Sequence, residues 1–224
     1  MGLFDFLNKQ KKNVSKQSAQ AETPIEIDAT PDAPQPFGFK SAWLAIKGAT
    51  PQSVIETLPV SNATMANWDS GFACAYDHQD ERVFVTPELD GYVLVIGLWE
   101  LTLEQLEPIA RRFEEVQYFT SHRVVEQHSW TLFQKGNLIR HYFYVGESGE
   151  VDSKGEPTPQ EIELGLDKLL MSEEQYDESD DDEPEYEFPN EFNVIEIAAA
   201  WGVDPSMKNH QKEKSTGFVG KVRL

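Results

Sequence analysis

Histidines are the residues of this chain best suited to chemistry, because imidazole binds metals and exchanges protons near neutral pH. A metal site would require convergence among His78, His122, His128 and His141, of which His122 and His128 lie six residues apart. No zinc motif accompanies them. We therefore predict histidines that are buried and satisfied by backbone groups, with no metal ligand among them.

The single cysteine, Cys74, lies between two alanines in an apolar stretch that predicts a strand over residues 70–76. A small buried thiol suits that position, and no base is identifiable beside it that would make it a nucleophile. One cysteine cannot form an internal disulfide, which agrees with a reducing compartment. We predict no catalytic role for Cys74.

Motifs of common enzyme classes are missing from the sequence. It has no phosphate loop, no G-x-G-x-x-G turn, no G-x-S-x-G elbow and no H-E-x-x-H helix. Carboxylates are plentiful over residues 177–183, but the EF-hand spacing and its glycine are absent. We predict a protein that is not an enzyme, with no catalytic residue, no cofactor and no metal.

Charge is distributed unevenly along the chain, whose net charge is -20. Residues 1–16 carry four lysines and one aspartate (+3), and residues 208–224 carry five basic residues and one glutamate (+4). The part between therefore carries -27, from -20 minus 7. Such a body repels nucleic acid and attracts basic surfaces, which favours a basic protein partner such as a toxin.

An acidic stretch over residues 172–187 contains ten acids and no base. Its composition predicts a loose insert, which either binds a basic partner or only keeps the protein in solution. The acids assigned to partner binding are Asp177, Asp180, Asp181, Asp182 and Glu183.

A β-hairpin over residues 129–145 is the strongest structural prediction. Gly136 and Asn137 would form a two-residue type II′ turn, whose twist suits paired strands. The resulting register gives one face that we expect to be buried, with Trp130 opposite Phe143, Leu132 opposite His141, and Gln134 opposite Ile139, extended by Val145. The other face would present an interface anchor made of Phe133, Arg140, Tyr142 and Tyr144. Cover by a helix is the alternative for these four residues.

The remaining elements indicate an α+β fold with a mostly antiparallel sheet and three to four packing helices. Strands are predicted over residues 41–47, 81–86, 92–99 and 116–125. Helices are predicted over residues 52–58, from 103 to about 114, after Thr158, and over residues 188–205, the last with Phe192 facing inward.

The predicted domain covers residues 41–205, with the acidic insert inside it. Residues 1–40 combine a short amphipathic and basic start with a Pro- and Ala-rich linker, and residues 206–224 form a basic, mobile tail. The start suggests a membrane anchor as an alternative, formed by Leu3, Phe4, Phe6 and Leu7. No signal peptide or membrane-spanning run is present, so we expect a cytoplasmic protein.

Three stretches give the chain a family resemblance: residues 43–48 (WLAIKG), residues 146–151 (GESGEV) leading to residues 155–159 (GEPTP), and residues 198–205 (AAAWGVDP). Together they resemble a loose group of uncharacterised bacterial α+β proteins, and the resemblance implies no catalytic residue. In size and acidity the chain is also similar to immunity proteins that neutralise toxins. We therefore expect a non-catalytic binding protein of the immunity or inhibitor type. A peripheral membrane scaffold protein and an enzyme of unrecognised class are the alternatives, and the oligomeric state stays open.

Overall fold

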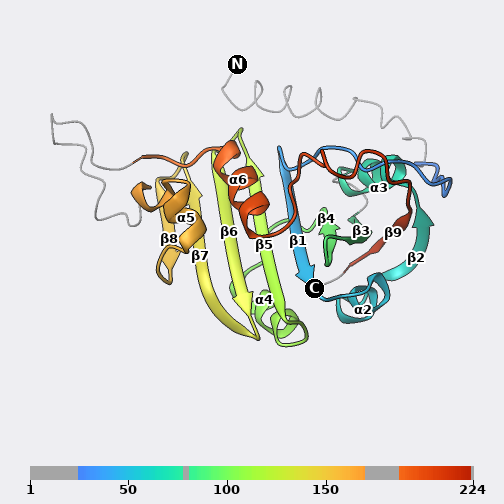
Figure 1. Cartoon of the computed structure of the whole chain (residues 1–224), viewed down its shortest axis with the longest axis horizontal. Coiled ribbons are helices and arrows are strands. Elements are labelled where there is room, and N and C mark those ends of the chain that lie inside the picture. Colours follow the sequence, from blue (N-terminus) through green and yellow to red (C-terminus); the bar gives the residue numbers. More distant parts are fainter. Residues whose placement is uncertain (1–24, 78–80, 170–186, 223–224) are drawn as a thin grey trace, which may run out of the picture.

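The computed structural model describes residues 25–77, 81–169 and 187–222, which form one antiparallel sheet of nine strands with helices on both faces (Figure 1). This is a mostly-β α+β fold, as the sequence predicts. The strands are β1 (Ser41–Lys47), β2 (Ser61–Ala66), β3 (Arg82–Leu89), β4 (Tyr92–Ile96), β5 (Glu115–His122), β6 (Gln127–Gln134), β7 (Asn137–Val145), β8 (Glu150–Lys154) and β9 (Gly217–Lys221). The helices are α2 (Pro51–Thr57), α3 (Trp68–Ala75), α4 (Leu103–Ala110), α5 (Pro159–Glu163) and α6 (Glu191–Trp201), with a short 3-10 helix (Leu166–Lys168).

The strand order is β2-β9-β3-β4-β1-β5-β6-β7-β8, so the first strand of the chain lies in the middle of the sheet. β1 pairs with β4 on one side and with β5 on the other, both in antiparallel register. All but the last residue of β1 are buried, because helices cover both faces of the sheet at its centre. A centrally placed strand of this kind is apolar on both faces, which explains its uninterrupted hydrophobic sequence.

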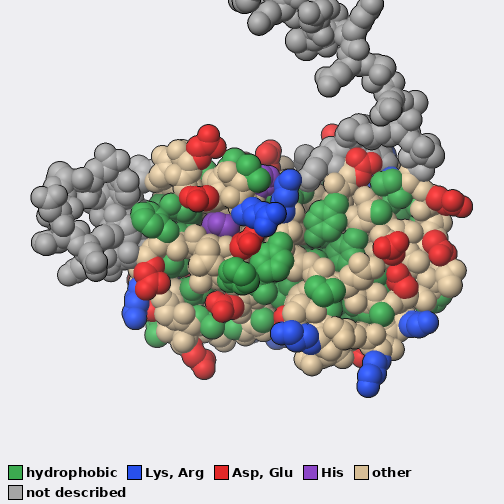
Figure 2. Space-filling view, turned by 90° about the horizontal axis from the view of Figure 1, so that it is seen from above, with side chains coloured by type: hydrophobic (Ala, Val, Ile, Leu, Met, Phe, Trp, Pro, Cys, Tyr) green, Lys and Arg blue, Asp and Glu red, His purple; other side chains and the backbone are tan. Residues whose placement is uncertain are grey.

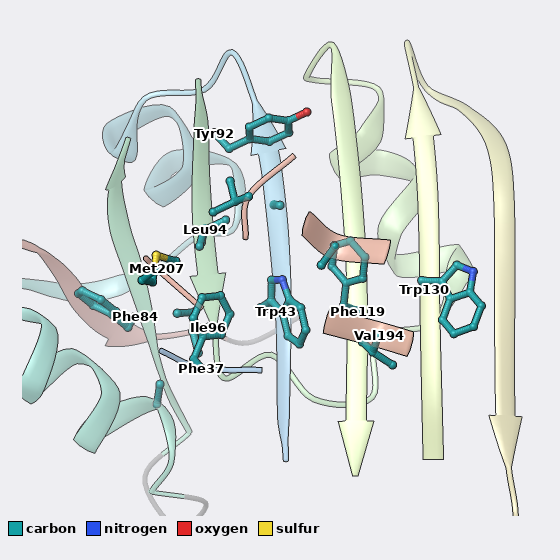
Figure 3. Packing of buried hydrophobic residues seen from close by; sticks show 14 of the residues in the cluster. Phe37, Trp43, Phe84, Tyr92, Leu94, Ile96, Phe119, Trp130, Val194 and Met207 are labelled. Atoms are coloured by element: carbon teal, nitrogen blue, oxygen red, sulfur yellow. The ribbon is translucent and has the colours of Figure 1, made fainter. Parts of the chain in front are cut away.

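Two hydrophobic cores lie on opposite faces of the sheet. Side chains alternate along β1, so Trp43 and Ala45 join the core beneath α3 and α6, whereas Leu44 and Ile46 join the core beneath α2 and α4. In the first core an aromatic row crosses the strands (Figure 3): Trp43 stacks on Phe119 with ring centroids 5.0 Å apart, and the edge of Phe37 meets Trp43 at 5.3 Å.

Threonines begin three of the helices, as the sequence predicts. The hydroxyls of Thr50, Thr102 and Thr158 each accept a hydrogen bond from the amide three residues later. That residue's side chain in turn accepts from the threonine amide, which completes a capping box. Local hydrogen bonds therefore fix where these helices start, although α4 ends at Ala110, before the predicted position.

The predicted hairpin is present, but its register is wrong by one residue. The turn residues are Lys135 and Gly136, both with positive φ as a type I′ turn requires, and Ile139 is an extra residue that interrupts the pairing. Trp130 therefore pairs with Tyr142 instead of Phe143. Because side chains alternate with a period of two, this shift moves the β7 residues from Arg140 onwards to the opposite faces from those predicted.

The strand predicted over residues 70–76 is wrong, since this segment is helix α3. Short apolar runs do not distinguish a strand from a buried helix by periodicity alone. Two side chains satisfy the first amides of the helix: the side chain of Asn67 accepts from the Ser70 amide at 2.9 Å, and Asp32 Oδ1 accepts from the Trp68 amide at 2.6 Å. Cys74 is a buried thiol on this helix.

The described parts of the predicted linker and basic tail belong to the folded structure. β9 lies between β2 and β3 and pairs with both, and Met207 is fully buried in the core. Phe37 is also buried, and Asp32 forms a β-bridge with Ser215. The predicted mobile tail is wrong because β2 and β3 are not paired with each other, and β9 supplies the backbone hydrogen bonds between them.

A fully buried ion pair holds α5 against the end of the sheet. Arg140 Nε donates to Glu161 Oε1 at 2.8 Å, and the Trp130 indole donates to the same oxygen at 2.8 Å. Arg140 Nη1 also donates to the carbonyls of His141 and Gly155, each at 3.0 Å. These bonds join β6, β7, the end of β8 and α5.

Replacing Glu161 with glutamine should lower the free energy of unfolding by about 3–5 kcal/mol, because Arg140 would become an uncompensated buried charge. The matched control is Glu163→Gln, on the same helix but exposed, which should change stability by no more than about 0.5 kcal/mol. Urea denaturation followed by tryptophan fluorescence measures both variants. Equal stability of the two would contradict the structural role given to the pair.

His210 should make stability depend on pH in the neutral range. Although burial opposes its charge, its hydrogen bonds to Glu213 (3.1 Å) and Asp90 (2.9 Å) raise its pKa above the usual value. The folded state then binds the proton more tightly, so this stabilisation is complete below the unfolded pKa and disappears as pH rises through the folded pKa. The stability difference between the native chain and His210→Gln should shrink from pH 6 to pH 8.5 in urea denaturation; a constant difference would contradict the assignment.

Candidate partner-binding site

The four hairpin residues predicted to contact a partner are buried. Phe133, Arg140, Tyr142 and Tyr144 each have at most a few per cent of their surface exposed. The corrected register turns Arg140, Tyr142 and Tyr144 towards the face that α5 and α6 cover, and Arg140 is committed to Glu161. The predicted interface anchor is therefore wrong in its placement: these residues support the fold.

The other predicted contacts lie outside the described residues. This applies to Asp177, Asp180, Asp181, Asp182 and Glu183 of the acidic stretch, and to Leu3, Phe4, Phe6 and Leu7 of the alternative membrane anchor. The two ends of the undescribed segment 170–186 can be placed, because Leu169 forms a β-bridge with Glu187 and the Glu187 amide donates to the Lys168 carbonyl at 2.8 Å. The acidic stretch thus rejoins the structure immediately before Phe188.

A concavity of about 910 Å³ lies beside this junction, where β6 begins, β7 ends and α6 starts. Its walls combine aromatic, acidic and basic side chains: Tyr144, Phe188 and Phe192; Glu126, Glu147 and Glu191; and Arg123 and His128. Figure 2 looks down on the upper ends of the strands in Figure 1 and shows hydrophobic side chains beside acidic, basic and histidine side chains. We call this region the aromatic-acidic concavity.

Two turns approach closely to form one wall of the concavity. The Gly146 amide, after β7, donates to the Glu126 carbonyl, before β6, at 3.2 Å. A Cβ at position 146 would lie 2.3 Å from Glu126 Oε2 and 2.8 Å from Glu126 Cβ, so only glycine permits this approach. The pair of turns thereby places Glu126 and Glu147 at the same rim.

The start of α6 forms the opposite wall. The Asn190 side chain accepts from the amides of Phe192 (2.8 Å) and Asn193 (3.3 Å), which fixes the first turn of the helix. Val194 and Ile197 face the core, so Phe192 projects from the other side and is 60% exposed. The predicted inward position of Phe192 is wrong: the capping pair Asn190 and Asn193 fixes where α6 starts, and the packing of Val194 and Ile197 on the sheet turns Phe192 outward.

Phe39 extends the aromatic surface from a different part of the chain. Its ring centroid lies 5.5 Å from that of Phe192, and both rings are about half exposed or more. The preceding Gly38 has φ +105°, and a Cβ there would lie 2.2 Å from Ile195 of α6. The positive φ is a conformation that favours glycine, and it lets this loop run against the helix. We call Phe39, Phe188 and Phe192 the aromatic rim; clustered exposed apolar side chains of this kind are typical of binding surfaces.

The electrostatics of the concavity favour cations. Three carboxylates against the one guanidinium of Arg123 leave an excess of two negative charges. His128 adds no positive charge at neutral pH, because burial lowers its pKa to about 4. His128 is only 3% exposed, and among the described residues its Nδ1 atom has no hydrogen-bond partner.

A second polar concavity, of about 520 Å³, lies on the other face of β5, β6, β7 and β8. His141 lines it, with Nδ1 2.8 Å from the Thr131 hydroxyl and Nε2 3.7 Å from Asp152. A hydroxyl, an imidazole and a carboxylate in this order resemble a nucleophile with its base. Thr131, however, is 1% exposed and does not line the concavity, so these bonds orient His141 instead of presenting a nucleophile.

The described histidines that were considered as possible metal ligands do not converge. His122, His128 and His141 line three different concavities, and His78 lies outside the described residues. Within residues 25–77, 81–169 and 187–222, no three histidine, cysteine or acidic side chains are grouped so as to hold a metal ion. The same ranges contain no helix that is both long and apolar enough to cross a bilayer.

His128 and His141 should titrate near pH 4, because burial opposes the charge on both rings. Between that value and about 6.5 the unfolded chain binds the protons more tightly, so stability should rise with pH across this window. Imidazole ¹H–¹⁵N NMR spectra recorded from pH 3.5 to 8 measure each ring, with His210 as an internal contrast whose pKa is raised. A midpoint above pH 6 for His128 would contradict its burial.

Comparison with known proteins adds no assignment: no protein-family model, curated protein or solved structure matches this chain. The resemblance to uncharacterised bacterial α+β proteins stays a prediction from short stretches of sequence.

Proposed function

We propose that this chain is a cytoplasmic bacterial protein that binds a basic protein partner at the aromatic-acidic concavity and its rim, in the manner of an immunity or inhibitor protein. The main support is one observation: the exposed rings of Phe188 and Phe192 line an acidic concavity where the acidic stretch rejoins the fold, and Phe39 packs against Phe192 beside it. The proposed partner is still a basic protein, but the proposed contact surface is now this concavity and not the hairpin residues.

The aromatic rim supports the apolar part of such a contact. Exposed aromatic side chains are enriched at the centres of protein interfaces, where they provide most of the binding energy. Neighbouring rings hold the aromatic rim in place. Phe39 contacts Phe192, and the ring centroid of Phe188 lies 5.8 Å from that of the buried Tyr144. A surface organised before binding loses less conformational entropy on association.

Charge supports the specificity of the contact. The concavity carries an excess of two negative charges, and the sequence that rejoins at Glu187 carries further acids without a base. A basic partner would be attracted over long range, which speeds association and makes it sensitive to salt. Nucleic acid would be repelled from the same surface.

Coexpression with the protein encoded beside this chain's gene tests the proposal. If that protein halts bacterial growth, the native chain should restore it, and the double variant Phe188→Ala and Phe192→Ala should lose the protection. The purified double variant should unfold within about 0.5 kcal/mol of the native chain, because both rings are exposed.

The matched control is Met65→Ala, which removes an exposed apolar side chain from β2 at the far edge of the sheet and should protect as well as the native chain. The proposal fails if the neighbouring protein is harmless, or if the double variant protects fully. With the purified pair, raising the ionic strength should slow association more than it speeds dissociation.

A further inference from the structure

Within the part of the chain that the structure describes, two buried polar atoms of residues that line the aromatic-acidic concavity lack a hydrogen-bond partner. Among the described residues, Glu191 Oε2 and His128 Nδ1 are both buried without a hydrogen-bond partner, and both residues line the concavity. Buried polar atoms in folded proteins are nearly always paired, because an unmade hydrogen bond costs more than a made one contributes. An ionised carboxylate accepts only, whereas a nitrogen of a neutral imidazole accepts or donates according to the tautomer. The group missing beside Glu191 is therefore a hydrogen-bond donor.

The charges define the donor as a cation. Glu126, Glu147 and Glu191 outnumber Arg123, so a phosphate or carboxylate ligand would meet net repulsion. His128 is neutral at pH 7 and does not repel a cation, because burial lowers its pKa to about 4.

The walls favour a planar cation over a compact one. Tyr144 and Phe188 present rings with centroids 5.8 Å apart and planes inclined by 42°, and Phe192 lines the same space. A guanidinium group stacks on aromatic faces, carries five donors in a fixed fork and is less strongly hydrated than an ammonium group. The carboxylate of Glu191 matches this fork, because carboxylates accept paired hydrogen bonds from arginine.

We infer that the aromatic-acidic concavity receives an arginine side chain of the partner, with Glu191 as the acceptor and the rings of Phe188 and Phe192 against the guanidinium plane. The inference rests on the proposed function and specifies its chemistry. It makes an arginine on the partner, not its overall basic charge alone, the group that this site recognises.

Three peptides that differ at one position test the inference on the full chain. Each carries a single arginine, lysine or citrulline flanked by glycine and serine residues, and binding is followed by ¹H–¹⁵N NMR titration. The arginine peptide should shift the amides around residues 126, 146 and 191. The lysine peptide should bind about tenfold more weakly, and citrulline, which keeps the shape but lacks the charge, weaker still.

Two variants locate the contact. Glu191→Gln should weaken arginine binding about tenfold, the loss expected for one charge-assisted hydrogen bond, and Phe188→Ala should weaken it several-fold. The matched control is Glu88→Gln, which removes an exposed carboxylate from β3 on the other side of β1 and should leave binding unchanged. Circular dichroism and urea denaturation establish that each variant is folded.

The inference is overturned if arginine and citrulline peptides bind equally, if neither binds, or if Glu191→Gln binds as the native chain does. These outcomes are separable from failure of the proposed function. If the rim variants lose toxin protection but the arginine peptide does not bind, the proposed partner surface is supported and only the inferred arginine site is refuted.

Discussion

The buried pair of Arg140 and Glu161 is the constraint on which one half of this structure depends. Neither charge is tolerable alone in the interior, so α5 must lie against β7 wherever the sheet forms. The same carboxylate binds the Trp130 indole and the Thr158 amide, and the Thr158 hydroxyl accepts from the Trp201 indole of α6. One polar network therefore sets the positions of α5 and α6 on this face. The proposed partner surface follows from that position, because its rim is the first turn of α6.

The surface itself combines distant parts of the chain. Phe39 precedes the first strand, Glu126 and Glu147 belong to two turns on the sheet edge, and Phe188 and Phe192 follow the acidic stretch. The close contact of Gly146 with Glu126 brings the two turns together. The proposed function thus needs no reacting group: rigid aromatic rings and an excess of carboxylates suffice for recognising a basic surface.

Local features of the fold could be predicted, and features that depend on register could not. Threonine caps start α2, α4 and α5 where expected, because a capping box involves only four neighbouring residues. The hairpin exists, but its turn lies one residue earlier and Ile139 bulges out. That small displacement placed Arg140, Tyr142 and Tyr144 inside the protein. A binding site predicted from one face of a strand is therefore misplaced when the predicted register is wrong by one residue.

The sequence by itself determined the fold class, the threonine-capped starts of α2, α4 and α5, and the acidic character of the protein. These follow from composition, from hydrophobic period and from contacts between near neighbours. The tertiary structure alone decided that residues 217–221 form a strand inside the sheet, that residues 68–75 are helical and that Phe192 faces outward. In each case the deciding partner lies far away in sequence: β2 and β3 for β9, Asp32 for α3, and the sheet beneath α6 for Phe192. Such long-range contacts leave no periodic signal in the segments that they organise.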